Sequence, residues 1–123
     1  MHNAAETAED YVELISELIG ESGEARSVDM ARRLGVSHVT VAKTIQRLQR
    51  EGLVQCEPYR AIFLTPDGRS LADRCRRRHQ EVVEFLTALG VSPRTAEIDA
   101  EGIEHHVSAE TLTAMRRFIE RRK

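Results

Sequence analysis

The stretch that most constrains the fold is MARRLGVSHVTVAKTIQRLQREGLV, residues 30–54, in which a glycine separates two helical patterns. Residues 28–34 place apolar side chains on one side of a short helix, for which Ser27 is the expected N-cap. Gly35 ends this helix, because glycine adopts the left-handed conformation that closes many helices. Ser37 then caps the longer helix that follows. Two helices joined by such a tight turn predict a helix-turn-helix.

The segments on either side of this unit extend it. Residues 8–20 carry apolar side chains at helical spacing, which predicts an amphipathic first helix. Residues 53–57 (LVQCE) and 61–65 (AIFLT) are two short β-prone runs, and they predict a hairpin with Pro58 in its turn. A hairpin directly after the second helix of a helix-turn-helix forms the wing of a winged helix.

The remaining sequence predicts three more helices. The first is long, with Thr65 as its cap and Gly90 at its end. The second is capped at Ser92 and has Pro93 in its first position, which suits the fixed φ of proline. The third follows Ser108 as its cap.

These patterns predict a mostly α protein with a winged helix-turn-helix domain over residues 1–72 and a small helical domain over residues 73–123. The long helix is shared at the boundary. Only 4% of the residues are aromatic and 31% are charged, which also favours a helical, soluble chain. No apolar run approaches the ~18 residues of a membrane span. Cys56 and Cys75 fit no CxxC pattern, so we expect reduced thiols, a cytoplasmic location and no membrane partner.

The charge of the chain is segregated. Residues 1–25 hold seven acids and no Lys or Arg, whereas residues 26–78 hold twelve Lys or Arg against five acids. Residues 79–123 hold eight acids against six bases, and the net charge is −2. A basic middle section is typical of nucleic-acid binding, because Lys and Arg near phosphates release condensed counterions. A solvated charged face would have the same composition and remains the alternative.

The second helix of the helix-turn-helix has a polar outer face that would enter the major groove of DNA. Lys and Arg donate to guanine or phosphate oxygens, and Ser and Thr are short donors that suit close approach. Arg60 at the hairpin tip is a further candidate for a phosphate or minor-groove contact, although it could be an ordinary turn arginine. The predicted DNA-binding residues are Ser37, His38, Thr40, Lys43, Thr44, Arg47 and Arg60.

Acidic and histidine side chains gather in DAEGIEHHVS, residues 99–108. On a helix, Glu101, Glu104 and His105 fall on one face, and Asp10 and Glu13 do the same on the first helix. Carboxylates that face each other repel and shift each other's pKa, so such a cluster needs either water or a metal ion. From the residues alone, the cluster could equally be an ordinary solvated surface.

Several motifs together carry a family resemblance that covers nearly the whole chain. They occur in this order: EDYVELI, GVSHVTVAKTIQRLQREGLV, FLTPDG, RRRHQEVVEFL and DAEGIEHHVS. In content, order and spacing the chain resembles the diphtheria-toxin-repressor family of metal-dependent repressors, and within it the manganese-responsive branch. The resemblance implies a two-metal site whose ligands are Asp10, Glu13, His79, Glu101, Glu104 and His105.

The carboxylates at positions 10 and 101 replace a Met and a Cys of the iron-responsive branch. This agrees with manganese, because oxygen ligands suit Mn(II) and sulfur favours softer metals. The resemblance implies a homodimeric repressor of manganese-uptake genes that binds double-stranded operator DNA when Mn(II), two ions per subunit, occupies an interdomain site. No small organic substrate is expected.

Two other classes of function are weighed against this one. A winged-helix regulator could sense another ligand, or another metal such as Fe(II). A di-metal enzyme is disfavoured, because the ligand helices are not a four-helix set with paired Glu-x-x-His motifs. We therefore expect no catalysis.

Overall fold

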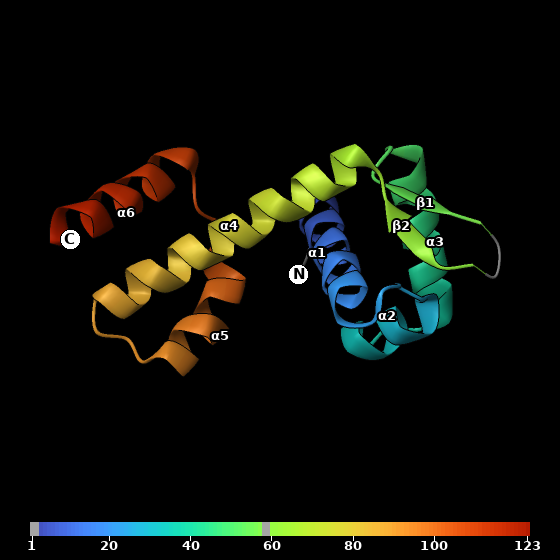
Figure 1. Ribbon diagram of the computed structural model, residues 1–123, viewed down its shortest axis with the longest axis horizontal. Helices are drawn as coiled ribbons and strands as arrows, with labels where there is room; N and C mark the ends of the chain where they lie inside the picture. The colour runs from blue at the N-terminus through green and yellow to red at the C-terminus, as the bar shows by residue number, and fades with distance from the viewer. Residues whose placement is uncertain (1–2, 58–59) are drawn as a thin grey trace. The chain divides into compact units, whose positions relative to one another are not determined.

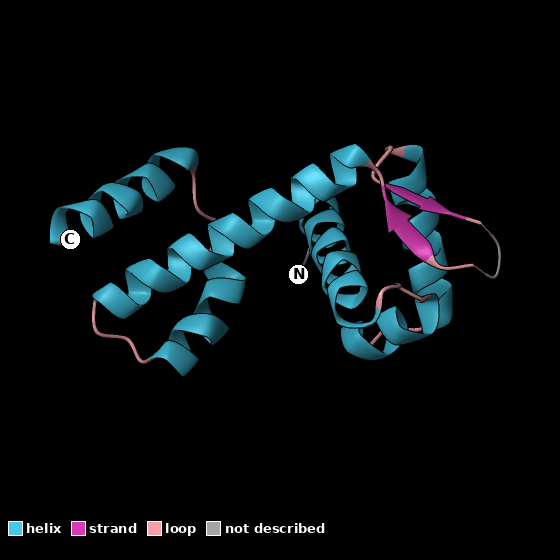
Figure 2. Cartoon of the chain, viewed as in Figure 1, coloured by secondary structure: helices cyan, strands magenta, loops and turns pink. Residues whose placement is uncertain are grey.

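The computed structural model describes residues 3–57 and 60–123, and the chain divides into two compact units, residues 1–73 and 74–123 (Figure 1). The predicted mostly α architecture is confirmed: six helices and one short hairpin make up the described part of the chain (Figure 2). The predicted turn residue Pro58 lies outside the described residues. Within the described ranges, no helix combines the length and the apolar character that crossing a membrane requires.

The first unit begins with α1 (Ala4–Ser22), which packs the predicted apolar stripe into the core. Its start is capped by Asn3, whose side chain accepts a hydrogen bond from the backbone N–H of Glu6 at 2.9 Å. Ile15 and Leu18 on the inner face are almost completely buried, and each such side chain contributes about 1.5–3 kcal/mol. Gly23 ends the helix with a φ of 86°, which a side chain would disfavour.

The helix-turn-helix consists of α2 (Ser27–Leu34) and α3 (His38–Arg50), which are joined around Gly35 at a φ of 68°. The prediction that Ser27 caps α2 is wrong: Ser27 is the first helical residue, and Arg26 occupies the N-cap position without a side-chain bond. The cause is a long-range contact. Ala25 forms an isolated β-bridge with Ile62, whose N–H donates to the Ala25 carbonyl at 2.8 Å, and this keeps the chain extended just before α2.

The wing is an antiparallel hairpin of β1 (Val54–Cys56) and β2 (Ile62–Leu64). Val54 pairs with Leu64 and Cys56 with Ile62, so that alternate side chains face the core. The two cysteines, Cys56 here and Cys75 on the next helix, are not joined by a disulfide, as predicted.

The long helix α4 (Pro66–Ala88) leaves the wing through Thr65, which caps it as predicted. The Thr65 hydroxyl accepts from the N–H of Gly68 at 3.0 Å and donates to the carbonyl of Gly52 at 2.6 Å. Gly68 is required at this point, because a Cβ there would lie 2.0 Å from the carbonyl oxygen of Leu53. The first turn of α4 is therefore packed directly on the backbone that precedes β1.

In the second unit, α5 (Pro93–Ile103) and α6 (Ala109–Arg122) lie on different sides of α4 (Figure 1). Their predicted caps are confirmed: Ser92 accepts from the N–H of Thr95 at 3.4 Å, and Ser108 accepts from that of Thr111 at 3.1 Å. Phe85 on α4 and Phe118 on α6 form an edge-to-face pair, with ring centroids 5.4 Å apart.

Candidate metal centre and nucleic-acid interface

The most unusual feature of the second unit is a histidine ring between two carboxylates. The Nδ1 atom of His79 on α4 is 2.6 Å from Oε2 of Glu104, and its Nε2 atom is 2.7 Å from Oε2 of Glu97. A carboxylate oxygen accepts only from a protonated nitrogen. Each of the two contacts therefore contains one proton, which is carried either by the ring nitrogen or by the carboxyl group. A single proton thus joins His79 to Glu104.

Glu104 is buried at this position, with 2% of its side chain exposed. It follows the last residue of α5, and its backbone N–H still donates to the carbonyl of Ala100 at 3.0 Å. The second carboxylate oxygen, Oε1, is 3.8 Å from Nε2 of His105, whose side chain is 4% exposed. Two imidazoles therefore face the two oxygens of one buried carboxylate.

Burial and hydrogen bonding shift the pKa values of Glu104 and His79 in opposite directions. Burial raises the pKa of Glu104, and the hydrogen bond to His79 offsets this effect only in part. Burial alone would lower the pKa of His79, but the hydrogen bonds to Glu97 and Glu104 outweigh it, so that the pKa of the ring is raised. A buried carboxylate needs a proton or a cation beside it. The donors present, carboxylate oxygen and imidazole nitrogen, suit a divalent metal ion.

The other predicted ligands are divided between the two units: Glu101 belongs to the second unit, and Asp10 and Glu13 belong to the first. Glu101 is exposed in the last turn of α5, and the regular helix ends at Ile103, so the expectation of one unbroken helix face through His105 is only partly met. Asp10 and Glu13 are half-buried and three residues apart on α1, in the first unit. Over residues 3–57 and 60–123, no three His, Cys, Asp or Glu side chains are placed as a complete metal site.

Glu97 was missed by the sequence analysis. It precedes Glu104 by seven residues, two helical turns, so both lie on the face of α5 that meets His79. This spacing was visible in the sequence. An exposed glutamate on a helix is so common, however, that only the packing of α5 against α4 distinguishes this one.

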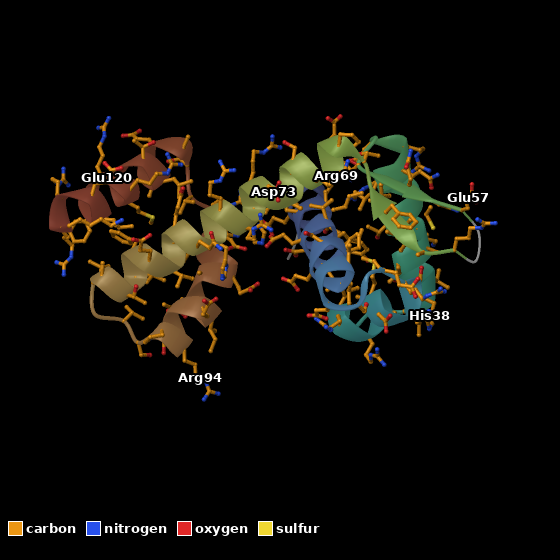
Figure 3. The ribbon with its side chains drawn as sticks, in the orientation of Figure 1. His38, Glu57, Arg69, Asp73, Arg94 and Glu120 are labelled. Atoms are coloured by element: carbon orange, nitrogen blue, oxygen red, sulfur yellow. The ribbon has the colours of Figure 1, made fainter. Side chains whose placement is uncertain are left out.

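Four of the predicted DNA-binding residues are exposed at the start of α3. They are Ser37, His38, Thr40 and Lys43, and His38 is labelled in Figure 3. Ser37 is also the N-cap, and its hydroxyl accepts from the N–H of Thr40 at 3.1 Å. The inner face of the same helix buries Val41 and other apolar residues, which fixes the direction in which the polar face points.

The remaining predicted DNA-binding residues are either half-buried or already paired with protein groups. Thr44 and Arg47 are half-buried, and Arg47 donates from Nη2 to the carbonyl of Ala4 at 3.1 Å. Arg60 is exposed shortly before β2 and pairs with Glu57 at 3.3 Å. Both arginines already bind protein groups, and their contacts with DNA stay predictions.

Two protein-family models together match almost the whole chain. Residues 4–62 match the N-terminal DNA-binding domain of iron-dependent repressors, and residues 65–123 match the metal-binding and dimerisation domain of the same proteins. The two matches correspond to the units that carry the winged helix and the His79–Glu104 group.

Curated relatives agree with the family models. The chain is 59% identical over 116 residues to the transcriptional regulator MntR of Escherichia coli O157:H7, covering 94% of this chain and 75% of the relative. It is 43% identical over 100 residues to the HTH-type transcriptional regulator MntR of Geobacillus kaustophilus, covering 81% of this chain and 71% of the relative. The predicted resemblance to the manganese-responsive branch is thereby confirmed.

Among solved structures, the chain is similar to a manganese-dependent transcriptional repressor in complex with manganese. The TM-score is 0.80 at 29% identity, and the match covers 92% of this chain and 52% of that one. The chain thus spans about half the length of that structure. From the matched domains and relatives, we conclude that the chain belongs to the diphtheria-toxin-repressor family of iron-dependent repressors.

Proposed function

We propose that the chain is a manganese-dependent transcriptional repressor that binds operator DNA as a homodimer. In this proposal residues 1–72 bind DNA and contribute two metal ligands, and residues 73–123 contribute the other four and dimerise. The observation that carries it is the buried carboxylate of Glu104, which has one imidazole near each oxygen. A buried carboxylate needs a proton or a cation beside it, and carboxylate oxygen and imidazole nitrogen are donors that suit a divalent metal ion.

The metal site we propose has six ligands and holds two Mn(II) ions per subunit. Its three donors within one group, His79, Glu104 and His105, would be joined by Glu101 from α5 and by Asp10 and Glu13 from α1. When bound, Mn(II) would supply positive charge that offsets the mutual repulsion of these carboxylates. Four carboxylates and two imidazoles, without a sulfur ligand, form a set that suits manganese.

The division of the ligands between the two units suggests how metal would control DNA binding. Asp10 and Glu13 belong to the unit with the winged helix, and the other four ligands belong to the second unit. Without a cation, the acids of the two units repel and the dimer samples many arrangements. A metal that binds only the arrangement competent for DNA shifts the population by its difference in affinity between the states.

The DNA contacts we propose centre on α3. Ser37, His38, Thr40 and Lys43 are exposed there and would approach bases or phosphates, with Thr44, Arg47 and Arg60 as the further predicted contacts. In a homodimer the two recognition helices would enter successive major grooves, about 34 Å apart. The target genes we infer are those for manganese uptake.

The test uses duplex DNA enriched from a randomised pool by the full chain in the presence of Mn(II). Binding of this DNA is then measured with Mn(II), with a chelator, and with the Glu104→Gln variant. We expect binding that requires Mn(II) and is lost in the variant. Glu120→Ala is the control, because it removes an exposed carboxylate of α6 in the same unit (Figure 3).

Two outcomes would contradict the proposal. Binding that ignores both the chelator and the variant would leave a winged-helix protein with another ligand. The matched family models describe iron-dependent repressors, so Fe(II) under anaerobic conditions is the second ion to compare. Stronger activation by Fe(II) than by Mn(II) at equal free concentrations would replace manganese with iron.

A further inference from the structure

We propose that Glu97 is a positioning residue for His79: it accepts the hydrogen on Nε2 and so reserves Nδ1 for the metal. This inference rests on the metal-binding function proposed above. Glu97 is not one of the six proposed ligands. The contacts that support its role all lie within the second unit.

The two sides of the His79 ring differ in their surroundings. On the Nδ1 side lies Glu104, at 2.6 Å and with 2% of its side chain exposed, and its other oxygen leads to His105 at 3.8 Å. On the Nε2 side lies Glu97, at 2.7 Å and with 60% of its side chain exposed. The donors that a cation needs therefore gather at Nδ1, whereas the carboxylate at Nε2 faces solvent.

Glu97 can remain in place when a cation binds. An ion at Nδ1 would replace the proton between His79 and Glu104, and both would then be its ligands. The proton on Nε2 is not displaced, and Glu97 continues to accept it. Histidine ligands commonly donate their second N–H to a carboxylate, which fixes the tautomer and the ring orientation and increases the basicity of the other nitrogen.

The position of Glu97 within α5 keeps its carboxylate beside His79. It lies in the middle of α5, between the capped start at Ser92 and the end at Ile103, and Ala96 and Ala100 beside it are buried. Glu97 and Glu104 are about 10 Å apart along the helix axis, at about 1.5 Å per residue. The helix thus presents two carboxylates that the imidazole ring spans, one on each nitrogen.

The experiment measures Mn(II) affinity of the full chain from the electron paramagnetic resonance signal of free Mn(II). We compare the wild type with Glu97→Ala, Glu97→Gln and the control Glu120→Ala. Loss of such an outer partner typically weakens metal binding 10–100-fold, and we expect a loss of about this size in Glu97→Ala. Glu97→Gln should lose less, because its amide oxygen can still accept from Nε2–H, and the control should bind as the wild type does.

A second readout examines the ring itself and uses the unmutated protein. In the chain loaded with diamagnetic Cd(II) and containing isotope-labelled histidine, NMR identifies which nitrogen of His79 carries the metal. We expect Cd(II) at Nδ1 and a proton at Nε2. This measurement keeps the proposal testable even if Glu97→Ala fails to fold.

The outcomes separate this inference from the proposed function. If the wild type binds Mn(II) and both Glu97 variants bind it equally well or more tightly, the positioning role of Glu97 is refuted and the metal site stands. Cd(II) at Nε2 refutes it as well, because Glu97 would then neighbour the metal instead of a proton. If the wild type itself binds no Mn(II), the proposed function fails and this inference fails with it.

Discussion

Replacing Gly68 with alanine should destabilise the chain, although alanine is the better helix former. The new Cβ would lie 2.0 Å from the carbonyl oxygen of Leu53 and 3.0 Å from its carbon, and both are backbone atoms that cannot rotate away. To reach ordinary contact, the start of α4 must move about 1.4 Å away from Leu53. A side-chain rotation cannot provide this movement.

The expected loss of folding free energy follows from the contacts that this movement would stretch. Thr65 donates from its backbone N–H to Leu53 at 3.1 Å and from its hydroxyl to Gly52 at 2.6 Å. Each such hydrogen bond contributes about 1 kcal/mol. Overpacking of this kind typically costs about 1–3 kcal/mol, and the weakened hydrogen bonds add about 1 kcal/mol, which offsets a gain in helix propensity of at most about 1 kcal/mol. We expect Gly68→Ala to lower the free energy of unfolding by about 1–3 kcal/mol.

The assay is urea unfolding followed by circular dichroism, with Gly20→Ala as the matched control. Gly20 lies inside α1, and a Cβ there meets nothing within 4 Å. This variant should therefore gain about 0.5–1 kcal/mol from helix propensity. If Gly68→Ala is as stable as the wild type, or is stabilised as the control is, the direct packing of α4 on Leu53 is wrong.

Three further predictions concern one cap, one DNA contact and the metal. Ser108→Ala should lower the free energy of unfolding by about 1 kcal/mol in urea, because α6 loses its side-chain cap, and Ser108→Asp should restore most of it; equal stability of all three proteins would argue against the cap. Lys43→Ala should weaken binding to all DNA sequences alike and reduce the slope of log affinity against log salt by about one, whereas an unchanged slope would remove Lys43 from the phosphate contacts. A chelator should release the chain from its enriched DNA, and added Mn(II) should restore the complex; retention of the complex in chelator would separate DNA binding from metal.

Local chemistry made much of the fold predictable from sequence. Ser37, Ser92 and Ser108 cap their helices as expected, because a cap depends on side-chain and backbone groups within a few residues. Ser27 failed because the chain before it is held extended by the Ala25–Ile62 bridge. That contact joins residues far apart in the sequence, and no local pattern encodes it.

In the candidate site, too, local spacing was predictable from the sequence, whereas long-range packing was not. The spacing of Glu101, Glu104 and His105 predicted a shared face, but Glu101 is exposed, whereas Glu104 is buried beside His79. Glu97 was not singled out, because its role depends on which ring nitrogen faces it after α4 and α5 pack. Spacing identifies residues that can meet, whereas burial and partners are decided by packing.

A calorimetric titration of the metal-free full chain with Mn(II), run beside the Glu104→Gln variant, tests whether Glu104 and its two histidines form a metal centre. It needs no knowledge of the operator. We expect saturable binding of Mn(II) by the wild type, at up to two ions per subunit. The variant should lose that binding, and its circular dichroism spectrum should match that of the wild type. Absence of binding by the wild type, or equal binding by both proteins, would contradict the assignment of Glu104 and its two histidines as the metal centre.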